Sequence, residues 1–369
     1  MILIRNCRMI DPASGTDGLR DILTDGSRIA RIGAAGSIAV PDGDVRVIEA
    51  DGLAAAPGLV DTHVHFRDPG AEYKEDIFTG AKAAAAGGFT SVVLMANTTP
   101  HVDNEETLSY VTEKGKKTGI HVYTCANVTM DMAGDELTDM ETLAKAGAVG
   151  FTDDGKPLLD AGLARKAMQE AARLHMPISF HEENPAFIVN NGINAGAVSQ
   201  KLGLGGSDRQ AEIDMVRRDL SIALETGADI VIQHISAKEA VELVRQARRK
   251  SPRIHAEATP HHFTLTEEAV LEYGTLAKMN PPLKGRHAGS DCDRPCAPRC
   301  RGKAEGICQS AQRHHRSGNG ASARHYAAYG HRKADAFGAF GVHDGQSGKA
   351  VSSGRRLSCR GRAGGSCFV

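Results

Sequence analysis

A repeated alternation of apolar runs and helical segments, which begins at Gly58, constrains the fold of this chain more than any other feature. Apolar or β-branched runs of strand length occupy residues 58–65, 91–96, 121–128, 147–152, 177–181, 229–235 and 253–259. Between them lie segments with helical spacing, at residues 74–86, 105–117, 158–174, 208–226 and 237–250. Seven alternations predict an α/β fold with a parallel sheet, and at 369 residues we expect closure into a (β/α)₈ barrel, with one strand unaccounted for.

The sequence divides into three parts. Residues 1–57 show short strands separated by Gly, Asp and Pro, which predicts a small β-subdomain. Residues 58–283 form the expected barrel. Residues 284–369 are basic and of low complexity, with 16 Lys and Arg against 5 Asp and Glu, and we expect this tail to be disordered.

Composition excludes several classes of function. The formal net charge of −1 argues against a nucleic-acid binder, and the absence of an apolar run of about 18 residues argues against a membrane span. No signal peptide is recognisable, and only Cys7 and Cys125 precede the tail, so we expect a cytoplasmic protein in a reducing compartment.

Two histidines stand at the end of the first apolar run. His63 and His65 are two residues apart, so on a strand both imidazoles leave the same face and can bind one metal ion. Arg67 continues that face and can hold a substrate carboxylate through paired hydrogen bonds. The substrate is therefore expected to be small and anionic.

Further polar residues follow the later strands. They are Asn97, Asp153, Asp154, His181, His234 and His262. In a barrel these positions meet at the carboxyl ends of the strands, where active sites lie. Three or four imidazoles and a carboxylate fit one or two Zn²⁺ ions, which would generate hydroxide from water at neutral pH. The expected reaction is hydrolysis of an amide-like carbonyl, or its reverse.

Several of these motifs resemble one family. Asp61-Thr-His-Val-His-Phe-Arg-Asp-Pro-Gly70, Met95-Ala-Asn-Thr98, Phe151-Thr-Asp-Asp-Gly155 and Met279-Asn-Pro-Pro-Leu283 are together similar to type I dihydroorotases, which are amidohydrolases. The resemblance covers roughly residues 1–283. It implies a TIM-like barrel and the reversible cyclisation of N-carbamoyl-L-aspartate to dihydroorotate in pyrimidine biosynthesis.

The resemblance also implies roles for individual residues. His63 and His65 would bind one zinc ion, His181 and His234 would bind a second, and Asp154 would bridge them, with Asp153 as the alternative. The implied substrate-binding residues are His65, Arg67, Asn97 and Asn280. A homodimer or a complex with aspartate carbamoyltransferase is also consistent with the family.

The tail departs from the family pattern. The family has an eighth strand with an Ala-Thr-Asp-His-Ala-Pro-His signature, whose Asp is the catalytic acid/base, and neither is recognisable after Leu283. Codons that can encode residues 291–299 also encode this signature when the reading frame is shifted by one base. In the same shifted frame, codons for residues 309–320 and 346–351 can encode further sequences that resemble the family. We therefore interpret the tail as frame-shifted. We identify no catalytic acid/base residue, and expect this chain to be poorly folded and nearly inactive while its in-frame parent is active.

Three alternatives stay open. A hydantoinase- or allantoinase-like enzyme usually bridges its metals with a carboxylated lysine on the fourth strand, whereas that strand has no lysine here and Lys156 lies beyond Gly155. A non-catalytic partner of aspartate carbamoyltransferase would generally lose the metal-binding histidines. A zinc or nucleic-acid module in the tail would use residues with unusual spacing: Cys292, Cys296, Cys300, Cys308, His314 and His315.

Overall fold

The structure is a computed structural model that describes residues 1–285. The expected position of the eighth strand, the hidden signature and the tail cysteines and histidines all lie outside the described residues.

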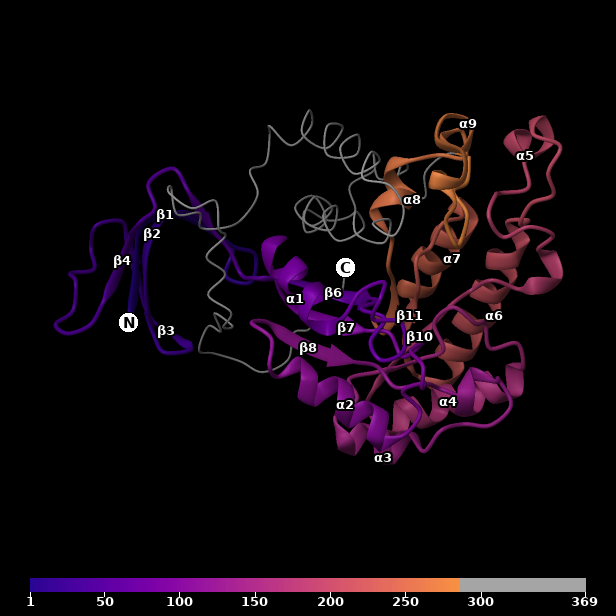
Figure 1. Ribbon diagram of the computed structural model, residues 1–369, viewed down its shortest axis with the longest axis horizontal. Coiled ribbons are helices and arrows are strands. Elements are labelled where there is room, and N and C mark those ends of the chain that lie inside the picture. Colours follow the sequence, from indigo (N-terminus) through magenta and orange to yellow (C-terminus); the bar gives the residue numbers. More distant parts are fainter. Residues whose placement is uncertain (286–369) are drawn as a thin grey trace.

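The chain begins with a sheet of its own, which Figure 1 shows to one side of the remaining strands. Its strands are β1 (Ile2–Asp11), β2 (Thr16–Asp25), β3 (Arg28–Ala34), β4 (Arg46–Glu49) and β5 (Ala54–Ala55). Their order is β3-β2-β1-β4, with β5 also paired to β1. A small separate core of Cys7, Met9, Ile22 and Ala50 fills one face of this sheet. The division between residues 1–57 and the following part stays a prediction.

Seven parallel strands follow, as the alternation predicts. They are β6 (Leu59–Val64), β7 (Phe89–Leu94), β8 (His121–Thr124), β9 (Phe151–Thr152), β10 (Pro177–Phe180), β11 (Asp229–Ile232) and β12 (Ile254–Ala256). The ladders are β6-β7-β8 and β9-β10-β11-β12, and a parallel bridge between Ala126 and Phe151 links them. The α/β class with parallel strands is confirmed. Within residues 1–285, β6 pairs only with β7 and β12 only with β11, so closure into an eight-stranded barrel stays a prediction.

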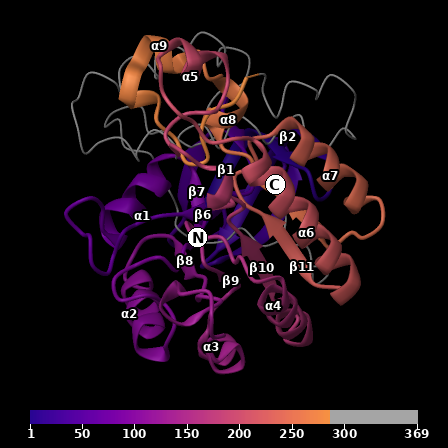
Figure 2. The ribbon, with the colours of Figure 1, turned by 90° about the vertical axis from the view of Figure 1, so that its right-hand side faces the viewer.

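Helices surround these strands on the outside (Figure 2). The covering helices are α1 (Ile77–Ala86), α2 (Glu105–Gly115), α3 (Met140–Ala146), α4 (Ala161–Arg173), α6 (Gln210–Thr226) and α7 (Lys238–Arg248). Strand residues such as Phe151, Ile178 and Ile230 are fully buried in the resulting core.

Local chemistry explains where the helices begin and where one prediction differs from the structure. Asp76 caps α1 by accepting hydrogen bonds from the backbone N–H groups of Phe78 and Thr79, at 2.7 and 3.0 Å. The sequence reasoning missed α3, which is only seven residues long. This helix ends at Gly147, whose φ of 112° is left-handed, so the strand expected over 147–152 is confined to β9.

Short helices gather at one end of the molecule, beyond the strands. They are α5 (Ala197–Lys201), α8 (Pro260–Thr264) and α9 (Ala269–Tyr273). The 3₁₀ turn η3 (Gly274–Ala277) directly follows α9, and the turns η1 (Met130–Met132) and η2 (Pro185–Phe187) lie earlier in the chain. Figures 1 and 2 both place α5, α8 and α9 together. A hydrogen bond of 2.7 Å from Asn194 to Glu267 joins the loop before α5 to the segment between α8 and α9.

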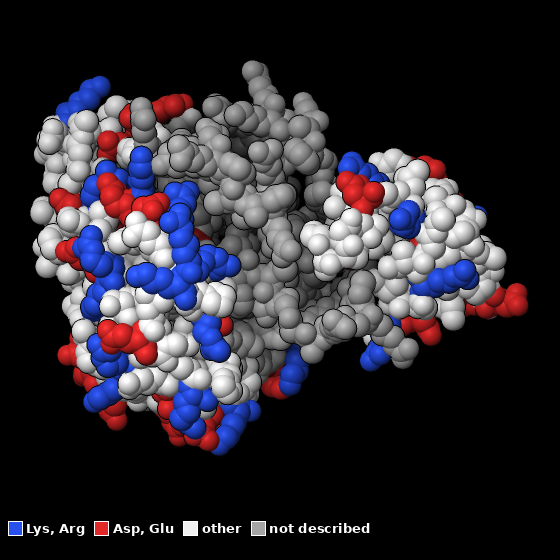
Figure 3. All heavy atoms as spheres, turned by 180° about the vertical axis from the view of Figure 1, so that it is seen from behind, with Lys and Arg blue, Asp and Glu red and all other residues white. Residues whose placement is uncertain are grey.

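The visible surface carries charges of both signs. Lys and Arg are interspersed with Asp and Glu over the described part of the face in Figure 3. Arg173, for example, forms ion pairs with Glu141 and Glu170, each at 2.6 Å. Among the helices of residues 1–285, none has the length and apolar character that a membrane crossing requires.

Candidate metal centre

Four parallel strands deliver five side chains to one place. His63 lies in β6 and His65 just after it, while Asp154, His181 and His234 follow β9, β10 and β11. The carboxyl ends of parallel strands lie at one edge of a sheet, which explains why residues up to 171 positions apart in the sequence meet. All five are buried or half-buried.

The Asp154 carboxylate lies at the centre of this cluster. Its Oδ2 is 3.2 Å from Nε2 of His65, and its Oδ1 is 3.5 Å from Nε2 of both His63 and His234. Nδ1 of His181 lies 3.8 Å from the same Oδ1. The two sets His63, His65, Asp154 and Asp154, His181, His234 each bring their ligand atoms within 4.8 Å of one another. Asp154 is the member that both sets share.

The adjacent carboxylate has a different role. Asp153 accepts a hydrogen bond of 2.9 Å from the backbone N–H of Val128, and further hydrogen bonds from the backbone and hydroxyl of Thr129. It therefore holds the loop after β8. Of the two aspartates between which sequence reasoning chose, only Asp154 faces the histidines.

The chemistry of the donors fits a bound metal ion. Nε2 of His63 and of His65 are 3.2 Å apart, and Nδ1 of His181 is 2.9 Å from Nε2 of His234. Two nitrogens bound to one tetrahedral zinc ion lie about 3.3 Å apart, given Zn–N distances of 2.0–2.1 Å. Oδ1 of Asp154 is buried and accepts no hydrogen bond from the described residues. A buried carboxylate oxygen without a donor is costly, and a cation would satisfy it.

Further polar groups orient the imidazoles. Oδ1 of Asn97 lies 3.1 Å from Nδ1 of His65, and its Nδ2 donates to the backbone oxygen of Asp154 at 3.0 Å. Oε2 of Glu183 is 2.8 Å from Nε2 of His181, and Oε1 of Glu257 contacts Nδ1 of His63. Such contacts fix which ring nitrogen carries the proton and which faces the centre.

Sequence reasoning missed the roles of Glu183 and Glu257. The available signal was the presence of each charged residue at the end of an otherwise apolar strand run.

The electrostatics of the cluster favour a charged Asp154. Burial alone would raise the pKa of Asp154, but the neighbouring His63 and the contacts with His181 and His234 hold this pKa well below its usual range. Burial would lower the pKa of His181, yet Asp154 and Glu183 raise it to about 9. The site is therefore built around an ionised carboxylate, the form that binds a cation.

Arg67 and His234 have unusual backbone conformations. Their φ angles are 59° and 31°, in the left-handed region that residues other than glycine rarely adopt. Such conformations persist where the surroundings enforce them, and they cluster at functional sites. Burial lowers the pKa of the Arg67 guanidinium, whereas the negative charge of Asp154 acts to raise it. Arg67 is therefore close enough to the cluster for its charge to interact with that of Asp154.

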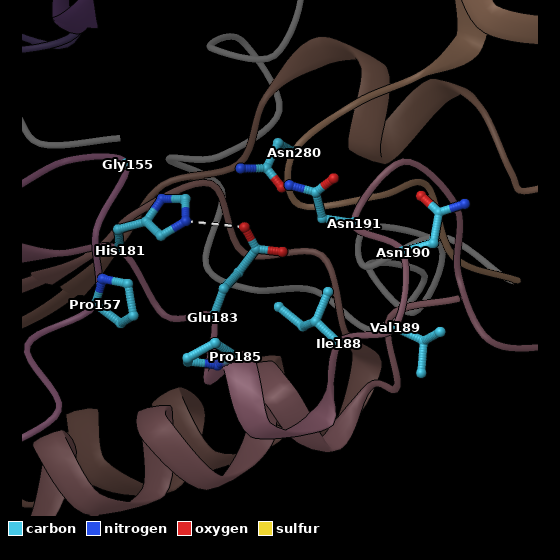
Figure 4. Close-up of a pocket in the computed structure, with 10 residues that line it drawn as sticks. All are labelled: Gly155, Pro157, His181, Glu183, Pro185, Ile188, Val189, Asn190, Asn191 and Asn280. Carbon is cyan, nitrogen blue, oxygen red and sulfur yellow. Dashed lines mark hydrogen bonds and ion pairs between the residues drawn. The ribbon is translucent and has the colours of Figure 1, made fainter. Parts of the chain in front are cut away.

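A cavity of about 590 Å³ adjoins the histidines. His181, Glu183 and Asn280 line it, together with Asn190 and Asn191 from the loop after η2 (Figure 4). The predicted substrate-binding residue Asn280 thus lies beside the centre.

His262 lies apart from the cluster of five. Its Nδ1 is 2.7 Å from Oγ1 of Thr259, and its Nε2 is 2.9 Å from the backbone oxygen of Pro281. Burial lowers the pKa of His262 to about 4. Both ring nitrogens are therefore engaged, Nδ1 with the segment of His262 itself and Nε2 with the loop that carries Asn280.

Comparison with known proteins identifies the family. The family model described as dihydro-orotase-like matches residues 52–240, a segment that contains all five clustered side chains. A dihydroorotase of Clostridioides difficile is 53% identical over 286 residues, which are 78% of this chain and 67% of the relative. This chain belongs to the dihydroorotase-like family. The resemblance inferred from the motifs is confirmed.

A second relative and a solved structure are also similar to this chain. A dihydroorotase of Clostridium acetobutylicum is 48% identical over 77% of this chain and 66% of its own length. Among solved structures, the L-hydantoinase (dihydropyrimidinase) of Arthrobacter aurescens has a TM-score of 0.66 at 23% identity, covering 77% of this chain and 64% of that protein. At that identity the likeness concerns the fold. The chain thus spans about two thirds of the length of these relatives.

Proposed function

We propose that this chain carries the metal-binding and substrate-binding parts of a dihydroorotase. That enzyme reversibly closes N-carbamoyl-L-aspartate to (S)-dihydroorotate in pyrimidine biosynthesis. The observation that carries the proposal is the convergence of four histidines on the Asp154 carboxylate, inside the segment that matches the family.

The proposed metal is zinc, in one or two ions. His63 and His65 would hold one ion, His181 and His234 the other, and Asp154 would contact both, which follows the two sets of ligand atoms. Bound zinc would polarise a carbonyl oxygen and lower the pKa of a bound water.

The chain's own residues position the substrate in this proposal. The Arg67 guanidinium is influenced by the charge of Asp154, and it would hold a substrate carboxylate through two parallel hydrogen bonds. Asn280 would donate to a further oxygen from the wall of the cavity. The carboxamide of Asn97 already engages His65 and Asp154, so we propose that it orients these residues before it contacts substrate.

We further propose that in the in-frame parent these strands close into a barrel through an eighth strand between β12 and β6, a strand that is not recognisable in the sequence of the present chain. This position supplies the catalytic acid/base Asp in the family pattern, and the frame-shifted tail would not supply it. Loss of a positioned acid/base typically lowers turnover by 10²- to 10⁴-fold. Homodimerisation, a complex with aspartate carbamoyltransferase and a cytoplasmic location stay predictions from the resemblance.

An assay of two purified chains tests the proposal. The first is this 369-residue chain, and the second has the reading frame restored after Leu283. The sequence alone led us to expect a poorly folded chain, but residues 1–285 already bring all five candidate ligands together, so we expect both chains to retain zinc. We expect the restored chain to cyclise carbamoyl-aspartate 10²- to 10⁴-fold faster. Hydantoin and allantoin serve as comparison substrates. Ordinary turnover by the present chain would contradict the interpretation of its tail, and preferred turnover of hydantoin or allantoin by the restored chain would contradict the assignment.

A further inference from the structure

Glu257 touches two of the clustered histidine residues with a single oxygen. It directly follows β12, and its Oε1 contacts Nδ1 of His63 and accepts a hydrogen bond of 3.2 Å from the backbone N–H of His234. His63 belongs to one set of ligand atoms and His234 to the other. Glu257 itself belongs to neither set, so its contacts act on the ligands from outside.

The backbone of Glu257 is firmly held. Its N–H donates to the oxygen of Ile232 at 2.9 Å, and its own oxygen accepts from the N–H of Ile235 at 2.9 Å. Both hydrogen bonds join Glu257 to residues that flank His234 in the sequence, Ile232 and Ile235. A carboxylate on a backbone held in this way can orient the groups that it contacts.

The contact with His63 also crosses a gap in the sheet. Within the described strands, no ladder joins β6 to β12, so backbone hydrogen bonding does not set the position of His63 relative to β11 and β12. The contact between Glu257 and His63 joins these strands at the level of the metal centre.

The contact with His234 supports a strained backbone. The φ of 31° at His234 is costly for a residue other than glycine, and the Glu257 carboxylate stabilises this conformation by accepting a hydrogen bond from the His234 N–H. With Nδ1–H of His63 donating to the same carboxylate, the lone pair of Nε2 is left facing Asp154 and His65.

We infer that Glu257 is a positioning residue that orients His63 and His234 together and thereby sets the affinity of both halves of the site for zinc. The inference rests on the proposed zinc-dependent function and assigns a role to a residue outside the ligand sets. His65 offers a contrast, because its Nδ1 faces the neutral carboxamide of Asn97. A carboxylate partner makes an imidazole a more basic ligand than a carboxamide does.

Zinc affinity, measured on the full chain by competition with a chromophoric chelator, tests the role of Glu257. We expect Glu257→Ala to weaken binding by about 10- to 100-fold. Glu257→Gln keeps an oxygen for the His234 N–H, so it should recover part of the affinity but shift the visible absorption of the Co²⁺-substituted protein. The matched control is Glu242→Ala on the exposed face of α7, for which we expect no change.

A double-mutant cycle separates this role from general stability. If Glu257 acts through His63, Glu257→Ala should cost much less affinity in a His63→Ala background than in the wild-type chain. The inference would be overturned, with the proposed function unaffected, if the zinc affinity of Glu257→Ala were within twofold of the wild-type value or if the substitution lowered the affinity equally in both backgrounds. A wild-type chain that binds no zinc would instead overturn the proposed function, and this inference with it.

Discussion

Asp153 and Asp154 are neighbours in sequence but have opposite surroundings. Asp153 accepts hydrogen bonds from backbone N–H groups and from the hydroxyl of Thr129, so every contact stabilises the loop that it holds. Asp154 faces imidazoles, and its Oδ1 has no hydrogen-bond donor among residues 1–285. Although both residues directly follow β9, one side chain stabilises a loop and the other faces the candidate metal ligands.

Matched substitutions of this pair should therefore have opposite effects. Asp153→Asn replaces one of the carboxylate oxygens, which accept hydrogen bonds, by an NH₂ group, which donates them. It should reduce the free energy of unfolding by about 1–3 kcal/mol with little change in zinc affinity. Asp154→Asn should lower zinc affinity at least tenfold and leave the stability of the zinc-free protein unchanged or higher. Chemical denaturation and chelator competition on both variants measure the two quantities. The assignment fails if Asp153→Asn is the variant that loses zinc.

The residues that carry the strongest local signal were the ones predictable from sequence. His63, His65, His181 and His234 stand at the ends of apolar runs, so strand periodicity alone places them at one edge of the sheet. The contact between Glu257 and His63 spans 194 positions and depends on how β12 lies against β6, which no local pattern specifies. His262 has the same local signal as the other histidines, but its surroundings engage both ring nitrogens.

At the scale of elements, a buried ion pair fastens the segment that carries Asn280. Lys284 donates to Oε2 of Glu212 on α6 at 2.9 Å, and Oε1 of Glu212 accepts from the backbone N–H groups of Ser236 and Ala237, both at 2.9 Å. Helix α6, the loop after β11 and the segment after η3 therefore meet at one carboxylate. Removal of either charge would leave the other buried and unpaired.

This ion pair should make the free energy of unfolding depend on pH in the acidic range. Burial opposes ionisation of Glu212, but Lys284 and the hydrogen bonds lower its pKa from 4.5 to about 2. Because the folded state has the lower pKa, the contribution is complete above about pH 4.5 and is lost as the pH falls toward 2. The size of the shift corresponds to about 3 kcal/mol.

Urea denaturation between pH 6 and 2 measures this contribution. The double variant Glu212→Gln/Lys284→Met, which lacks both charges, is the reference because other carboxylates titrate in the same range. We expect the wild-type chain to lose up to about 3 kcal/mol more than the reference over this interval. Parallel pH profiles for the two proteins would show that Glu212 is not held in its charged form.

At the scale of the whole molecule, the metal centre links strands that the described ladders leave in two groups. His63 and His65 belong to the ladder β6-β7-β8, whereas Asp154, His181 and His234 follow strands of the ladder β9-β10-β11-β12. Within residues 1–285 the two groups are joined by one isolated β-bridge, between Ala126 and Phe151, and by neighbouring backbone hydrogen bonds such as that from Val149 to Thr124 at 3.1 Å. Zinc bound by the two sets of ligand atoms would join the two groups of strands, because Asp154 belongs to both sets.

Zinc should accordingly stabilise the fold as a whole. A ligand that binds only the folded state at 100 times its Kd adds about 2.7 kcal/mol, which raises the Tm of a domain of this size by roughly 3–5 °C. Differential scanning calorimetry with and without zinc measures the shift, and a chelator should reverse it. Because His65→Ala and His234→Ala each remove a ligand from one ladder group, either substitution should sharply reduce the shift. A shift of equal size in the wild-type chain and in both variants would mean that zinc binds elsewhere, and the two strand groups would then be held together by the core alone.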